Sequence, residues 1–292
     1  MRRLVVLAAV LLAGCGEAPR AVPPPGPVIV GQHRVAPRIV DLDVRSPALG
    51  RTAKVRLLLP AGWDRTRRWP VLYLLHGCCD TYDSWTRETD VEDLPELRDV
   101  LVVMPEGGAT GFYSDWLEKG GPRWETFHLV ELRRLLERDF GAGTQRAIAG
   151  LSMGGFGALS YAARHPGLFK AAASYSGVVH PLGDVELVQG IARDEGEDPD
   201  GLWGDPLAQR AVWAAHDPTE QAAGLRGTRV FVSIGNTGFV ERTLRRENDA
   251  LRTALRRAGV PATLHFYAHG THDWPYWQRE LHRSLPVLLG AL

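Results

Sequence analysis

Cysteine is scarce in this chain, with three residues among 292, at positions 15, 78 and 79. Two neighbours and one distant cysteine match no zinc-ligand spacing, so no metal or other cofactor is expected. A disulfide between adjacent cysteines strains the backbone between them. We therefore predict two packed free thiols at Cys78 and Cys79, with a strained vicinal disulfide as the alternative.

An excess of charge of either sign is also missing. Lysine and arginine together number 34 and so do aspartate and glutamate, giving a formal net charge of +0. The arginines are scattered among acidic residues, as on a solvated surface of mixed charge. Nucleic acid is therefore not expected as a partner.

The chain has one pronounced apolar run, at its start. Arg2 and Arg3 precede the apolar residues 4–13, which are too few to span a bilayer and are typical of a secretory signal. The run ends in Leu12-Ala13-Gly14-Cys15, which resembles the lipobox of bacterial lipoproteins. We expect residues 1–14 to be removed and Cys15 to be lipidated, giving an exported protein anchored to the membrane. An ordinary signal peptide that contains a cysteine, with a secreted product, is the alternative.

The remaining chain divides into a tether and one large domain. Residues 15–37 include five prolines between positions 19 and 27 and predict an extended tether. Residues 38–292 form the predicted domain. Within it, residues 183–221 are rich in Gly, Asp and Pro and are long for a connection, so they predict a lid over the site, with a disordered insertion as the alternative.

Strands alternate with helices along the domain. Residues 39–45 and 53–59 alternate apolar and polar side chains, which predicts half-buried antiparallel strands at a sheet edge. Later strands are short apolar runs, typical of parallel strands buried on both faces. These runs are residues 71–75, 101–104, 147–150, 171–174, 229–234 and 263–267, with helices expected within 124–140, 155–164 and 241–258 and after residue 274. The pattern predicts an α/β fold with a mostly parallel sheet covered on both faces.

Residues 150–154, Gly-Leu-Ser-Met-Gly, match the nucleophile elbow of α/β-hydrolases. The motif requires a serine on a sharp turn between a strand and a helix, with glycines where the backbones approach closely. A strand pattern precedes it here and a small-residue helix follows, so the context agrees with the motif. We predict Ser152 as the nucleophile of an α/β-hydrolase fold.

A histidine after the last strand is the expected base, because the order in this fold is Ser, acid, His. His269 and His272 bracket that loop, and we favour His272, which lies at its far end. The usual place for the acid, after residues 230–234, holds Asn236, which cannot supply a negative charge. Glu241 is the nearest carboxylate to that strand end, followed by Glu247 and Asp249.

Two backbone N–H groups should form the oxyanion hole. Met153 follows the nucleophile and provides one. The loop after residues 71–75 provides the other, and Cys78 is our choice. His76, in the same loop, precedes the serine and is expected to shape the pocket.

Several further segments resemble the secreted antigen 85 mycolyltransferases of mycobacteria and corynebacteria, within the wider "putative esterase" (esterase D-like) superfamily. The similarity runs from about residue 39 to the C-terminus. It rests on Val-Val-Met-Pro at 102–105, Phe-Tyr-Ser-Asp-Trp at 112–116, Trp-Glu-Thr-Phe at 124–127, Gly-Leu-Ser-Met at 150–153 and Gly-Thr-His-Asp-Trp-Pro-Tyr-Trp at 270–277. The resemblance implies Glu241 as the acid and His272 as the base, and it supports Cys78 and Met153 as oxyanion donors.

The chain departs from those enzymes at two places. They carry Asp-Gly where this sequence has His76-Gly77, and that aspartate is implicated in holding trehalose. After the serine they carry small polar residues, where this chain has the glycine-rich segment 154–157 of ordinary esterases. Specificity for trehalose and mycolate is therefore not implied.

The sequence thus predicts an exported serine esterase or acyltransferase that acts on acyl esters through an acyl-Ser152 intermediate, with water or a sugar hydroxyl as acceptor. Trp116 and Trp274 are expected, with His76, to contact substrate. The alternatives are a polysaccharide-directed esterase of feruloyl or acetyl xylan type, and a non-catalytic carbohydrate- or matrix-binding member of the fold.

Overall fold

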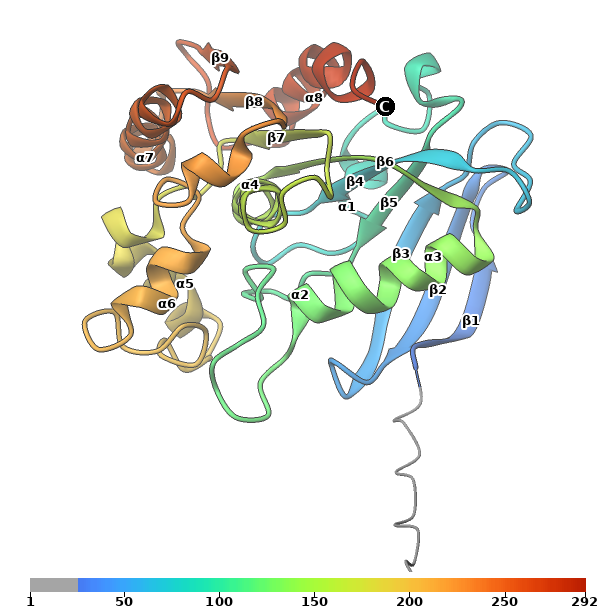
Figure 1. Ribbon diagram of the computed structural model, residues 1–292, viewed down its shortest axis with the longest axis horizontal. Helices are drawn as coiled ribbons and strands as arrows, with labels where there is room; N and C mark the ends of the chain where they lie inside the picture. The colour runs from blue at the N-terminus through green and yellow to red at the C-terminus, as the bar shows by residue number, and fades with distance from the viewer. Residues whose placement is uncertain (1–25) are drawn as a thin grey trace, which may run out of the picture.

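A nine-stranded sheet forms the centre of the computed structural model, which describes residues 26–292 (Figure 1). The strand order is β1-β2-β3-β5-β4-β6-β7-β8-β9. The six strands β4 to β9 pair with one another in parallel, as the short apolar runs predict. They are β4 (Trp69–Leu75), β5 (Leu101–Pro105), β6 (Ala142–Leu151), β7 (Ala171–Tyr175), β8 (Arg229–Ile234) and β9 (Ala262–Phe266).

The antiparallel edge begins earlier than the sequence predicts. β2 (Ile39–Ser46) and β3 (Arg51–Leu58) confirm the two expected strands, but β1 (Val28–Arg34) precedes them and pairs with β2. Residues 28–34 therefore belong to the sheet, and the predicted boundary of the tether at residue 37 was wrong. The strand begins with the apolar run Val28-Ile29-Val30, but it is mostly exposed and follows directly on the proline-rich stretch. Cys15 and residues 1–14 lie outside the described residues.

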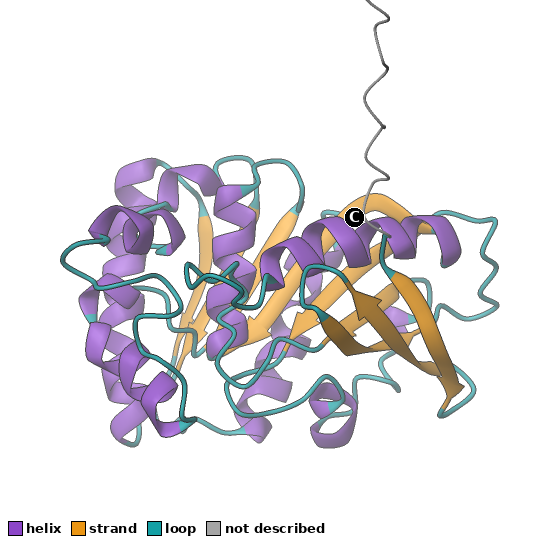
Figure 2. Ribbon diagram, turned by 90° about the horizontal axis from the view of Figure 1, so that it is seen from below, coloured by secondary structure: helices purple, strands orange, loops and turns teal. Residues whose placement is uncertain are grey.

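Helices cover both faces of the sheet, which Figure 2 shows as a twisted layer. One face packs against α4 (Met153–Arg164), α7 (Phe239–Ala258) and a helix in three parts: α2 (Trp124–Thr126), the wider π-helical η2 (Phe127–Leu132) and α3 (Arg133–Asp139). The other face packs against α1 (Ser84–Glu88) and α8 (Trp274–Leu289). Each of the four predicted helices is confirmed.

The segment between β7 and β8 is structured. It contains η3 (Pro181–Gly183), α5 (Val185–Asp194), α6 (Arg210–His216) and η4 (Ala222–Leu225); a further short turn, η1 (Pro95–Leu97), lies before β5. Trp203 and Trp213 are fully buried and stack edge to face, with ring centroids 5.0 Å apart. Their burial joins this segment to the core, and the alternative of a disordered insertion was wrong.

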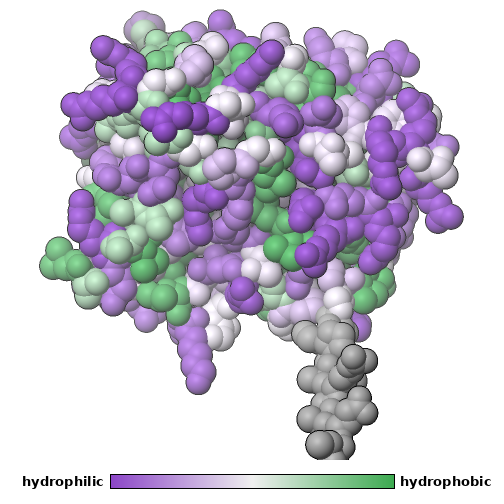
Figure 3. Space-filling view, in the orientation of Figure 1, coloured by the Kyte–Doolittle hydropathy of each residue, from purple (hydrophilic) through white to green (hydrophobic). Residues whose placement is uncertain are grey.

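The surface shows no single dominant patch on the face drawn in Figure 3, where hydrophobic residues occur as small groups among hydrophilic ones. Within residues 26–292, none of the helices combines the length and the apolar character that crossing a membrane requires.

Candidate active site

Ser152 lies on the turn between β6 and α4 in a backbone conformation that L-residues rarely adopt, with φ of 51° and ψ of −120°. Its N–H donates to the Tyr175 carbonyl on the neighbouring strand, 2.9 Å away. Gly150 and Gly154 face each other across the turn, and a Cβ on either would collide with backbone atoms. The strained serine and the close glycine contact are the geometry that a nucleophile elbow requires.

His272 and Ser152 line the same pocket, His272 from the loop between β9 and α8. Nδ1 of His272 lies 4.0 Å from Oε1 of Glu241, which is fully buried in the first turn of α7. Oε1 also accepts a hydrogen bond of 2.6 Å from the Ser176 hydroxyl. His272 Nδ1 and Glu241 Oε2 are both buried and have no hydrogen-bond partner among the described residues. The structure therefore brings the three predicted residues together, with the His–Glu contact about one ångström longer than a hydrogen bond.

Burial disfavours the charged form of both partners. It raises the pKa of Glu241 to about 7, against a smaller lowering by the Ser176 hydrogen bond. It lowers the pKa of His272 to about 4, so this imidazole is neutral at neutral pH and can accept a proton.

The two predicted oxyanion donors are free. Met153 is the first residue of α4, where helix geometry leaves the N–H without an internal partner. In residues 26–292, neither its N–H nor that of Cys78 donates to another backbone group. Gly77, just before Cys78, packs against the elbow: a Cβ there would lie 3.3 Å from the Ser152 Cβ.

His76 does not line the pocket. It is 1% exposed, and its Nε2 accepts the Gly107 N–H at 2.9 Å while Nδ1 contacts the Gly77 carbonyl at 2.7 Å. Because an N–H can only donate, Nε2 is the acceptor and Nδ1 carries the proton. Burial lowers the pKa of His76, in agreement with this neutral form. His76 shapes the site by linking the loops after β4 and β5, and its predicted contact with substrate has no support in this geometry.

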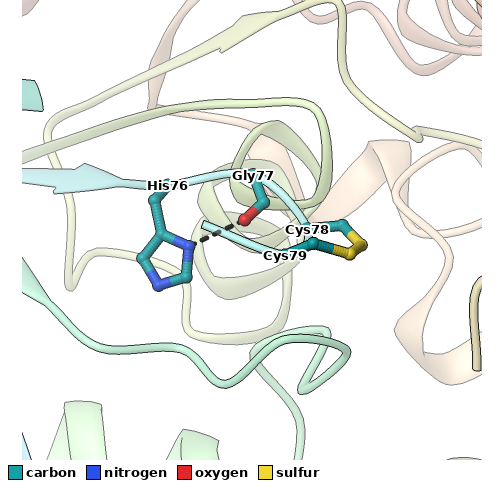
Figure 4. Close-up of a disulfide and its surroundings, with 4 residues drawn as sticks. All are labelled: His76, Gly77, Cys78 and Cys79. Atoms are coloured by element: carbon teal, nitrogen blue, oxygen red, sulfur yellow. Dashed lines mark hydrogen bonds between the residues drawn. A yellow bond between two sulfur atoms is a disulfide. The ribbon is translucent and has the colours of Figure 1, made fainter. Parts of the chain in front are cut away.

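Cys78 and Cys79 form a disulfide, so the prediction of two free thiols was wrong and the alternative holds. Figure 4 shows the bridge beside the His76–Gly77 hydrogen bond. The second cysteine adopts a left-handed conformation, with φ of 64°, and its N–H donates to the Ala109 carbonyl at 3.1 Å. The prediction rested on the general rarity of disulfides between adjacent cysteines. That rule does not take into account the left-handed turn in which this pair lies.

The pocket has a volume of about 280 Å³. Trp274 lines it as predicted, together with Trp277, whose ring meets His272 edge to face at 4.9 Å. Asp80, on the rim, is the one carboxylate among the lining residues. The remaining lining residues are Gly77, Cys78, Cys79 and Leu151.

Two other predicted features lie elsewhere. Trp116 borders a separate cavity of about 420 Å³ with Trp124 and Arg51, so the geometry does not support its contact with a substrate at Ser152. No residue of the segment 183–221 lines the Ser152 pocket. The segment is packed against the core, and its predicted role as a lid is not confirmed.

Ser176, whose hydroxyl binds the Glu241 carboxylate, was not predicted from the sequence. It lies just after β7, on the loop at the carboxyl end of a parallel strand, and has φ of 48°. Its place at the strand end was the available signal, since functional side chains gather at that edge of an α/β sheet.

A sequence profile of the family described as "Putative esterase" matches residues 46–288. The chain belongs to this family. Esterase Rv1288 of Mycobacterium tuberculosis is 33% identical over 266 residues, covering 85% of this chain and 57% of that protein. The chain thus spans little more than half the length of that relative. The diacylglycerol acyltransferase/mycolyltransferase Ag85B of Mycobacterium intracellulare is 33% identical over 279 residues, covering 86% of this chain and 82% of the relative.

Solved structures agree with this membership. MPT51 (FbpC1) of Mycobacterium tuberculosis matches with a TM-score of 0.74 and 27% identity, over 86% of this chain and 97% of that one. A ferulic acid esterase matches with a TM-score of 0.66 and 25% identity, over 87% of this chain and 98% of that one. These comparisons confirm the α/β-hydrolase fold and the antigen 85-like resemblance of this esterase-family protein, in a family of ester hydrolases and acyltransferases.

Proposed function

We propose that the protein is an exported serine esterase or acyltransferase that works through an acyl-Ser152 intermediate. His272 Nε2 takes the proton of the Ser152 hydroxyl as its oxygen attacks the acyl carbonyl, and the protonated His272 then gives that proton to the departing alcohol. Glu241 accepts a hydrogen bond from the Nδ1–H of His272 and stabilises the imidazolium. Water or a second alcohol then takes the acyl group from Ser152.

One observation carries this proposal. His272 Nδ1 lies 4.0 Å from Glu241 Oε1, and both Nδ1 and the second carboxylate oxygen, Oε2, are buried without a hydrogen-bond partner among the described residues. A buried polar atom without a partner costs free energy, on the order of 1–3 kcal/mol. Catalytic hydrogen bonds are often long in the free enzyme and shorten when substrate binds, so a distance of 4.0 Å between Nδ1 and Oε1 is compatible with this role.

The pocket supports an ester with a short acyl group. About 280 Å³ is near the lower end of the range for small-molecule sites. Trp274 and Trp277 provide an apolar wall for the acyl part, and the N–H groups of Cys78 and Met153 are free to bind the oxyanion.

The test is Ser152→Ala, assayed on a series of p-nitrophenyl esters from acetyl to palmitoyl. We expect kcat to fall by about 10⁴-fold or more in the variant, and wild-type kcat/KM to be highest for the short esters. Ser160→Ala is the matched control, because Ser160 is a buried serine of the same helix whose hydroxyl bonds the His216 carbonyl. Unchanged turnover in Ser152→Ala, with both variants folded, would refute the serine mechanism.

A polysaccharide-directed esterase is the second candidate, supported by the likeness to the ferulic acid esterase and by the small pocket with two tryptophans. Methyl ferulate and acetylated xylan test it directly. Trehalose, added as acceptor to the short-ester assay, tests transfer: a trehalose ester among the products favours the acyltransferase, and free acid alone favours the esterase.

A further inference from the structure

We propose that the cavity between α3 and the start of β6 binds a phosphate-type oxyanion, which a lipid headgroup or a soluble phosphate compound would carry. The cavity has a volume of about 460 Å³. Three arginines, one glutamate and the first residues of β6 line it: Arg68, Arg133, Arg146, Glu137 and residues 142–144. Arg146 precedes Ser152 by six residues of largely extended chain, about 20 Å, so the site lies apart from the active site and does not rest on the triad.

The direction of the Arg146 side chain follows from the strand that carries it. Side chains two residues apart on a strand point to the same face, and Ile148 is buried in the core that α3 covers. Arg146 therefore points toward α3, where its Nη2 donates to Glu137 Oε1 at 2.6 Å. The strand bulges at this end, because residues 142–146 of β6 lie opposite residues 69–71 of β4. Residues of the bulge line the cavity.

Positive charge exceeds negative charge in this cavity. Its three guanidinium groups face a single carboxylate, which leaves the lining with a formal charge of +2. That carboxylate is already shared, because Glu137 Oε1 also accepts from Arg133 Nη1 at 2.9 Å. Asp139, on the same helix, is paired with Arg138 outside the cavity. An anion would therefore enter a site whose positive charge is only partly balanced.

Arg146 is the residue that indicates a ligand. It is 6% exposed, and its Nε is buried without a hydrogen-bond partner among residues 26–292. A guanidinium presents its N–H donors in a planar fork that matches two oxygens of a phosphate at once. The bond from Nη2 to Glu137 uses only part of that fork. Donors of a buried cation therefore remain for an oxyanion in the cavity, and a buried charge needs such partners.

Arg68 adds an exposed arginine to the same cavity. Within the described part of the chain, its side chain makes one hydrogen bond, from Nη1 to the Glu137 carbonyl at 2.7 Å. Its other guanidinium nitrogens can therefore turn to a phosphate without breaking that bond. A buried guanidinium and an exposed one would then bind different oxygens of the same group. The volume also leaves room for part of the molecule that carries the phosphate.

The experiment titrates inorganic phosphate into the full-length protein in a calorimeter at constant ionic strength, with chloride as the reference anion. Every protein carries Cys15→Ala, so that lipidation contributes to no measurement. We expect saturable binding with a Kd in the millimolar range or below, and a rise in Tm of about 3 °C at ten times that Kd.

Three variants assign the binding to the cavity. Arg146→Gln should weaken phosphate binding by about tenfold or more, because it removes a buried charge-assisted donor. Arg68→Gln changes an exposed residue, leaves the packing intact and should weaken binding by about threefold or more. Arg138→Gln is the matched control, an exposed arginine of α3 outside the cavity, and should bind phosphate as the parent protein does. Circular dichroism checks that each protein is folded, and Arg68→Gln decides if Arg146→Gln is not.

A second measurement identifies the carrier of the phosphate. The same proteins are sedimented with vesicles of phosphatidylcholine, with and without phosphatidylglycerol. Binding that requires phosphatidylglycerol and falls in the arginine variants assigns the site to a lipid headgroup, and phosphate binding without it assigns the site to a soluble compound. Two results would overturn the inference: no saturable phosphate binding beyond the chloride reference, or equal phosphate binding in the parent protein and in the folded Arg146→Gln and Arg68→Gln variants. The arginines would then serve only to hold α3 against the sheet.

Discussion

Glu241 and Glu247 are two buried carboxylates on the same helix, α7, with different surroundings. Glu241 faces the Ser176 hydroxyl and His272. Glu247 accepts the His180 N–H at 3.0 Å, and burial raises its pKa to about 8, so it is largely protonated at neutral pH. Glu241 thus lies against the imidazole of the proposed base, and Glu247 holds the loop that carries His180.

Replacing Glu241 by Gln separates these roles. An amide keeps the shape but cannot carry the negative charge that stabilises the imidazolium, so we expect kcat to fall by at least about 10²-fold with little change in KM. Glu247→Gln is the control and should retain wild-type kcat, since Gln closely resembles the protonated acid. Steady-state kinetics on a short p-nitrophenyl ester measure both. Equal losses in the two variants would point to folding rather than catalysis.

At this scale the sequence predicted the residues whose chemistry has a motif. Ser152 has a five-residue signature. Chain order in the fold leaves His269 and His272 as the base, and the family resemblance selects His272. His76 and Trp116 could not be placed in the same way, because a loop residue and an aromatic residue serve equally well in a wall, a core or a separate cavity. The Cys78–Cys79 bridge depends on a left-handed turn that no local pattern indicates.

Among the elements, α4 and the end of β4 meet at a very close contact. Gly154 sits where the helix begins, and a Cβ there would meet the carbonyl oxygens of Leu75 and His76, the latter at 2.5 Å. Backbone atoms cannot yield as a flexible side chain can. This contact is why the elbow turns sharply enough to expose Ser152.

Gly154→Ala should therefore lower the free energy of unfolding by about 1–3 kcal/mol or more. Gly190→Ala is the opposite case, because that glycine lies in α5 and an added Cβ would meet only the end of the Arg193 side chain, 4.0 Å away. There alanine should stabilise by about 0.5–1 kcal/mol. Urea unfolding of both variants measures the difference. A Gly154→Ala protein as stable as wild type would show that the loop after β4 can move aside.

Most strands and helices could be predicted because their pattern of apolar residues reflects which faces are buried. β4 and β5 are continuous apolar runs, and β2 and β3 alternate. β1 was not predicted, because its apolar residues 28–30 are only three, follow directly on the proline-rich stretch and give way to the polar residues 32–34. The π-helical turn in the helix of residues 124–139 also escapes the sequence, since it leaves the helical spacing of apolar residues nearly unchanged.

For the whole molecule, buried titratable groups set how stability depends on pH. Burial raises the pKa of Glu241 to about 7 and of Glu247 to about 8, so above about pH 4.5 the native state holds protons that the unfolded chain has lost. Burial also lowers the pKa of His76, and it lowers the pKa of His128, His216 and His272 to about 4 each. Below about pH 6.5 the unfolded chain therefore holds protons that the native state lacks.

These two groups of residues act in opposite directions. Between about pH 4 and 6.5 both groups contribute, but the histidines are more numerous than the glutamates. The free energy of unfolding therefore rises with pH over this range. Above about 6.5 the glutamates contribute together with His180, whose pKa is raised by its hydrogen bond with Asp217, and stability falls toward pH 8. We expect a maximum of Tm near pH 6–6.5, measured by calorimetry, and a shallower fall above it in Glu247→Gln. A Tm that rises steadily to pH 8 would contradict this account.

Location is also a property of the whole chain. If Cys15 is lipidated, as we propose, the wild-type protein should sediment with membranes and Cys15→Ala should not. Fractionation followed by detection with an antibody measures this. Recovery of the wild type wholly in the culture medium would contradict it.

The pairing of β1 with the sheet limits how far such an anchored enzyme could travel. Because the folded part begins at Val28, thirteen peptide units separate it from Cys15, and a chain of that length spans at most about 45 Å. The folded domain would then stay within about 45 Å of the bilayer surface at its near end. Esters bound at the membrane surface would then be present at a high local concentration around the protein, while esters further out in the envelope would have to diffuse to it.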